Sequence, residues 1–68
     1  MSRVGIWTVR RCGGLTELWA ELDTEQTEYA LPFALSDAIA IPQGQVTDSV
    51  LTVPEGSGRV YISGKETS

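Results

Sequence analysis

The sequence predicts one small, mostly β domain, an antiparallel meander or barrel-like sheet of about five short strands. Three observations predict this class. The chain has 68 residues, which suits a single domain. Turn signals rich in Gly, Pro, Asp and Ser recur along it, and the runs between them are short and rich in Val, Ile, Thr, Tyr and Trp. We place the domain at residues 1–63 and expect residues 64–68 to be a frayed tail.

The first two runs form a hairpin over residues 4–22 if Gly13-Gly14 is its turn. Two glycines accept the positive φ that a type I′ turn needs at both positions. This register places Arg10 opposite Glu17, and directly opposed side chains share one face of the sheet. The predicted core face carries Gly5, Trp7, Val9, Leu18, Ala20 and Leu22. The opposite face carries Val4, Ile6, Arg10, Leu15, Glu17, Trp19, Glu21 and Asp23.

The second half of that hairpin also fits a short helix. Its apolar residues follow helical spacing, and Glu, Leu and Ala favour helix: Leu15, Leu18, Trp19 and Leu22. However, the run covers only about two helical turns and has no capping residue after Gly14. We favour the strand, because the hairpin register accounts for both runs at once.

The remaining runs are predicted in order. Residues 28–35 alternate, but Pro32 cannot donate a hydrogen bond to a neighbouring strand, so an edge or bulged strand is expected there. Residues 38–41 fit either a strand or a single helical turn. Residues 46–53 alternate as one strand, and residues 59–63 form the last.

Composition limits how so small a fold is stabilised. One cysteine and no histidine exclude an internal disulfide and a Cys/His zinc site, and we expect folding without a metal or cofactor. A core of this size is marginal, so oligomerisation is the remaining device. We expect a homo-oligomer, most simply a dimer, with a well-packed monomer as the alternative. The apolar side chains on the outer hairpin face support this: Val4, Ile6, Leu15 and Trp19.

The sequence offers few residues suited to catalysis, and we expect that the protein is not an enzyme. The usual general base, histidine, is absent, and a chain this short hardly encloses a substrate pocket. Cys12 is interpreted as a small apolar residue at the hairpin end. Gly56-Ser57-Gly58 lacks the following Lys of a phosphate loop, and no Asp-x-Asp-x-Asp-Gly calcium loop is present. Arg10 and Arg11 are adjacent on a strand and point to opposite faces, so no direct nucleic-acid contact is predicted.

The acidic stretch over residues 17–28 is the main candidate for a functional surface. The net charge is −4, and this stretch holds five acids and no base beside two aromatic residues. Aromatic residues commonly anchor interfaces, and acids around them attract a basic partner. The alternative is an ordinary solvated strand face and loop. The predicted partner-binding residues are Glu17, Trp19, Glu21, Asp23, Glu25, Glu28 and Tyr29.

Two functional classes follow from these patterns. The first is an acidic protein-binding module, such as an inhibitor of a larger protein with a basic or nucleic-acid-binding surface. The second is a structural subunit that self-associates in a ring or particle. Low lysine beside frequent alanine, glycine and arginine is typical of GC-rich bacterial or phage genes. Residues 1–7 lack a signal-peptide pattern and no apolar run suits a membrane span, so we expect a cytoplasmic protein, in the host if phage-encoded.

Overall fold

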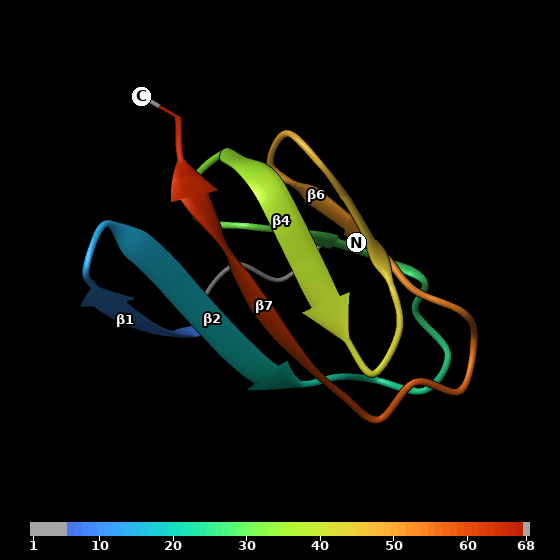
Figure 1. Cartoon of the computed structure of the whole chain (residues 1–68). Helices are drawn as coiled ribbons and strands as arrows, with labels where there is room; N and C mark the ends of the chain where they lie inside the picture. Colours follow the sequence, from blue (N-terminus) through green and yellow to red (C-terminus); the bar gives the residue numbers. More distant parts are fainter. Residues whose placement is uncertain (1–5, 68) are drawn as a thin grey trace.

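The computed structural model describes residues 6–67, and all its regular elements are strands (Figure 1). The mostly-β prediction is confirmed, with seven short strands where about five were predicted, and no helix occurs within the described range. The strands are β1 (Thr8–Cys12), β2 (Leu15–Glu21), β3 (Glu28–Ala30), β4 (Leu35–Ile41), β5 (Gln45–Thr47), β6 (Val50–Thr52) and β7 (Arg59–Glu66).

The strands form two open antiparallel sheets instead of one meander. The larger sheet has the order β1-β2-β7-β4, and the smaller has the order β3-β6-β5. In Figure 1 the last strand, β7, lies between β2 and β4. The central pair of the larger sheet therefore joins β2, from the first third of the chain, to β7, the last strand. Local sequence patterns do not encode such a long-range pairing.

The predicted hairpin is confirmed in its register. Arg10 pairs with Glu17 across β1 and β2, and the turn glycines Gly13 and Gly14 have φ values of 60° and 86°. Positive φ at both positions is the requirement of the two-residue turn. The helical alternative for residues 15–22 is wrong, because residues 15–21 form strand β2. The part of the prediction that concerns Val4 and Gly5 lies outside the described residues.

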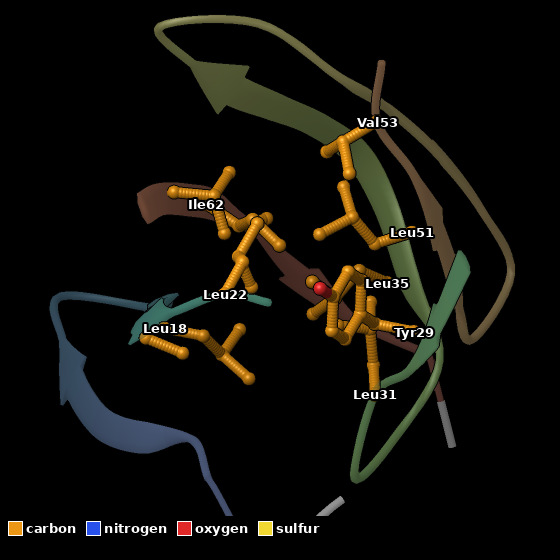
Figure 2. Packing of buried hydrophobic residues seen from close by; sticks show 10 residues of the cluster. Leu18, Leu22, Tyr29, Leu31, Leu35, Leu51, Val53 and Ile62 are labelled. Atoms are coloured by element: carbon orange, nitrogen blue, oxygen red, sulfur yellow. The ribbon is translucent and has the colours of Figure 1, made fainter. Parts of the chain in front are cut away.

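The core lies between the two sheets and is built by one face of each (Figure 2). The larger sheet contributes Leu18 and Ile62, which oppose each other across β2 and β7 and are both fully buried. The smaller sheet contributes Tyr29 and Leu51, an equally buried pair across β3 and β6. The predicted core face is confirmed for Leu18, Ala20 and Leu22, while Trp7 and Val9 are half-buried against the core.

Two of the later runs depart from their predictions. Residues 46–53 are not one strand, because a two-residue turn at Asp48-Ser49 folds β5 back along β6. Asp48 adopts a φ of 55°, a left-handed conformation that Asp tolerates better than most residues, so no glycine marks this turn. Residues 28–35 are not one strand either: β3 covers only residues 28–30, at the edge of the smaller sheet and before Pro32, and Leu35 already begins β4. The strand alternative for residues 38–41 is confirmed within β4.

The end of the chain is ordered further than predicted. Strand β7 continues to Glu66, and the Thr67 N–H donates to the Ala34 carbonyl at 3.0 Å, so residues 64–67 are not a frayed tail, while Ser68 lies outside the described residues. Gly64 lies against a bulge in β4, where an added Cβ would meet the Ala38 Cβ at 2.9 Å. These partners are distant in sequence, which explains why the terminal position of residues 64–68 suggested fraying.

Candidate functional site

The outer face of the larger sheet, which points away from the core, carries most of the exposed large hydrophobic side chains of the described residues. Among the described residues, four of the five exposed large hydrophobic side chains lie on it. They are Leu15, Trp19, Ile39 and Ile41, with exposed fractions of 43%, 38%, 64% and 55%. The fifth, Val50, belongs to the smaller sheet. Most monomeric proteins scatter such residues singly, so their concentration on one face requires an explanation.

A row of aligned side chains crosses this face. Thr8, Trp19, Tyr61 and Ile41 occupy paired positions on β1, β2, β7 and β4. The rings of Trp19 and Tyr61 stack with centroids 6.5 Å apart and planes inclined by 20°. The Arg10 guanidinium carbon lies 6.0 Å from the Trp19 ring centroid, a cation–π distance. We call the Trp19–Tyr61 pair the aromatic ridge.

The Glu17 carboxylate holds the Tyr61 ring of the aromatic ridge in place through a hydrogen bond. Its carboxylate accepts hydrogen bonds from the Tyr61 hydroxyl and from Arg10 Nε, the latter at 2.8 Å. The Tyr61 hydrogen bond, followed by that of Arg10, holds the pKa of Glu17 below its usual range. The same bond to Glu17 raises the pKa of Tyr61. Glu17 therefore stays ionised at neutral pH and holds Tyr61 in place beside Trp19.

A groove of about 830 Å³ runs beside the aromatic ridge. Apolar and aromatic groups dominate its walls, and one end is polar. At that end Glu21 and Arg59 form a loose ion pair with 3.8 Å between oxygen and nitrogen, and both side chains are largely exposed. Exposed ion pairs of this kind add little stability, so both groups are available to a ligand. The lining is Ile6, Thr8, Trp19, Ala20, Glu21, Ile41, Pro42, Arg59, Val60 and Tyr61.

Acidic loops continue beyond the polar end of the groove. The loops that follow β2 and precede β7 lie side by side, because the Gly56 N–H donates to the Thr24 carbonyl at 2.8 Å. Figure 1 shows both loops at the same end of the molecule as the β4–β5 connection. They carry Asp23, Glu25 and Glu55, and no base occurs in residues 22–28 or 52–58. We call these two loops the acidic end.

The seven predicted partner-binding residues do not form one surface. Glu17, Trp19 and Glu21 share the outer face, Asp23 and Glu25 lie in the acidic end, and Glu28 begins an edge strand of the smaller sheet. Tyr29 is fully buried in the core, and its hydroxyl donates to the Asp23 carbonyl at 2.9 Å. Tyr29 is therefore a structural residue and offers no exposed anchor.

Three residues that complete the outer face were not predicted from the sequence: Ile39, Ile41 and Tyr61. Ile39 and Ile41 alternate with smaller alanines, and Tyr61 alternates with the buried Val60 and Ile62. This alternation could have predicted which side chains are exposed. It could not have predicted that β4 and β7 lie beside β2, because those pairings are long-range.

In comparisons with known proteins, no protein-family model, curated protein or solved structure matches the chain. A function is therefore proposed from the geometry alone. Within residues 6–67, no group of three or more His, Cys, Asp or Glu side chains is placed to hold a metal ion. No helix in this part of the chain is long and apolar enough to cross a membrane.

Proposed function

We propose that this chain is a small protein-binding module that docks on a larger protein through the outer face of its four-stranded sheet. The observation that carries the proposal is the gathering of Leu15, Trp19, Ile39 and Ile41 on that single face. Burial of apolar area is the main favourable term in association, and a central tryptophan is a frequent anchor of interfaces. The proposal assigns the chain no reaction.

Charge supports a partner with a basic surface. The chain has a net charge of −4, and the two loops of the acidic end continue along the chain from the groove residues Glu21 and Arg59. Acids at the edge of an apolar contact raise the association rate with a basic partner and disfavour acidic competitors. A bound acidic module covers the basic surface that it occupies, so inhibition of the larger protein is the expected consequence.

The test compares two variants that each introduce a glutamate at an exposed apolar position, one on the larger sheet and one on the smaller sheet. Affinity capture from the source cell supplies the partner, which is then purified and titrated with wild type, Trp19→Glu and Val50→Glu. Trp19 and Val50 have exposed fractions of 38% and 40%, so the two changes are matched in exposure. Trp19→Glu is expected to weaken binding by at least about 30-fold, the equivalent of about 2 kcal/mol, with an unchanged Tm.

Val50→Glu is expected to leave the same affinity within about twofold. Equal losses in the two variants, or no loss in Trp19→Glu, would overturn the assignment of the outer face. Circular dichroism of each variant confirms that binding is compared between folded proteins.

Self-association through the same face is the second candidate. Two ion pairs on the outer face are locally neutral, because Arg10 pairs with Glu17 and Arg59 pairs with Glu21. Lys65 adds a positive charge near the end of β7, so this face does not carry the negative net charge of the chain that would repel a second copy. Light scattering over a range of concentrations separates the candidates. A dimer that Trp19→Glu dissociates favours self-association, and a concentration-independent monomer eliminates it.

A further inference from the structure

The groove beside the aromatic ridge combines three kinds of wall. The Trp19 and Tyr61 rings form the first, Ile41 and Pro42 form the second, and the Glu21–Arg59 pair closes one end. Because the Tyr61 hydroxyl is bonded to Glu17, this part of the groove is held in place before any ligand binds. Its volume of about 830 Å³ lies within the range of ligand-binding clefts, which is enough space for a short chain segment.

The charges around the groove are distributed unevenly between its two ends. Apart from Asp23, its polar end and the acidic end together hold three acids, Glu21, Glu25 and Glu55, against one base, Arg59, a net charge of −2. At the opposite end of the same face, Arg10 and Glu17 neutralise each other. A segment lying in the groove therefore meets a negative potential only where it leaves past Glu21.

From these two features we infer that the groove binds an extended, proline-containing segment of the partner protein that ends in Lys or Arg at the acidic end. This inference rests on the proposed function and names the ligand of the same face. Aromatic-lined grooves bind proline-rich segments because the polyproline II conformation is preformed and loses little entropy on binding. The basic residues supply the charge that complements Glu25 and Glu55.

A peptide titration tests this inference directly. The probe is the amidated peptide Pro-Pro-Leu-Pro-Pro-Arg-Lys, added to the isotope-labelled protein and followed by NMR. We expect chemical-shift changes at the Trp19 indole, the Tyr61 ring and the Ile41 methyl groups. A matched peptide with Glu-Glu in place of Arg-Lys is expected to bind at least about tenfold more weakly at low salt, because like charges oppose each other at the acidic end.

A pair of protein variants locates the charge effect. Glu25→Lys changes the acidic end, and Glu28→Lys makes the same charge change on the smaller sheet; both side chains are exposed. Only Glu25→Lys is expected to weaken binding of the Arg-Lys peptide and to reduce its salt dependence. Equal effects of the two variants, or equal affinity for the two peptides, would overturn the predicted direction of the ligand.

The outcomes separate this inference from the proposed function. If neither peptide shifts the groove resonances while the captured partner still binds in a Trp19-dependent manner, the peptide inference fails and the proposed function stands. If Trp19→Glu leaves the captured partner's affinity unchanged, both fail. Groove shifts that depend on protein concentration in the absence of peptide would mean that a second copy occupies the groove, which also overturns the inference.

Discussion

The two faces of the four-stranded sheet differ sharply in burial, yet large apolar side chains occur on both. On β2, Leu18 is fully buried while its neighbour Trp19 is 38% exposed, and on β7 the buried Ile62 follows Tyr61. An antiparallel sheet with one solvated face normally alternates apolar and polar residues, whereas sheets covered on both faces have continuous apolar runs. The outer face of this sheet is mixed: it carries the Arg10–Glu17 and Arg59–Glu21 ion pairs, but also large apolar side chains that the chain itself leaves exposed. The outer face is therefore the one that we assign to a partner.

The largest expected effect separates the two faces by their contribution to folding. Ile62→Ala empties a fully buried position and is expected to lower the free energy of unfolding by about 2–5 kcal/mol. Ile39→Ala removes a side chain that is 64% exposed, and its cost is expected to stay within about 0.5 kcal/mol. Urea denaturation followed by tryptophan fluorescence measures both. A similar cost at Ile39 would show that the outer face is already covered, as in a dimer.

The next effect concerns the tight contact between β7 and β4. Gly64→Ala would place a Cβ 2.9 Å from the Ala38 Cβ and 3.0 Å from its Cα, so the backbone must shift. We expect a loss of about 1–3 kcal/mol in the free energy of unfolding, as for other overpacked sites. Gly58→Ala is the control, because no atom lies within 4 Å of its added Cβ. If the two variants unfold at the same urea concentration, β4 does not pack against Gly64 in solution.

Much of the inner face could be predicted from sequence because its signals are local. The glycines at 13–14 set the turn, and the turn set the register that brings Leu18 to the core. The position of β7 between β2 and β4 could not be predicted, because it depends on pairings across most of the chain. The candidate site divides in the same way. Trp19 was found from its own hairpin, whereas Tyr61 reaches it only through the long-range pairing.

The same difference between local sequence signals and long-range packing explains why Tyr29 was predicted to be an exposed anchor. Its sequence neighbours are acidic, and exposure was inferred from them. The Tyr29 side chain is instead buried in the core on the inner face of the smaller sheet, and its hydroxyl donates a hydrogen bond to the Asp23 carbonyl. An aromatic residue beside acids can thus be buried when it alternates with them on a strand, because adjacent side chains point to opposite faces.

A smaller effect is expected from pH at the end of β7. Glu66 accepts two hydrogen bonds from Arg11, at 2.6 and 3.1 Å, and one from the Thr16 hydroxyl at 2.7 Å. The bond from Arg11, followed by that from Thr16, holds the pKa of Glu66 below its usual range. A lowered carboxyl pKa stabilises the fold above the unfolded-state pKa of about 4.3, and this stability is lost as pH falls through the folded-state value.

Thermal melts at about pH 7 and about pH 3 measure this contribution. We expect Glu66→Gln to have a lower Tm than wild type at the higher pH and a smaller loss of Tm on acidification. Glu28→Gln, a change at an exposed carboxylate of the smaller sheet, serves as the control. An acid-induced loss of Tm that is the same in Glu66→Gln and wild type would contradict a stabilising role for this carboxylate.

The smallest expected effect on stability tests whether the outer face is preorganised. Tyr61→Phe keeps the ring stacked on Trp19 but removes the hydroxyl that donates to Glu17. The change removes a single part-buried hydrogen bond while Arg10 still pairs with Glu17, so only a small loss of Tm is expected. The pKa of Glu17 should rise, because its first stabilising partner is lost, yet it should stay below the usual range while Arg10 remains.

Carboxyl ¹³C NMR titration of Glu17 measures that pKa in wild type, Tyr61→Phe, Arg10→Gln and the double variant. Each single change should raise it, and the double change should return it to the range of an ordinary glutamate. A Glu17 pKa that is unchanged by Tyr61→Phe would mean that the hydroxyl bond is not populated in solution. The aromatic ridge would then reorient freely, and a ligand would have to order it on binding. In that case the outer face would keep its apolar character but lose the preformed shape on which the inferred peptide site depends.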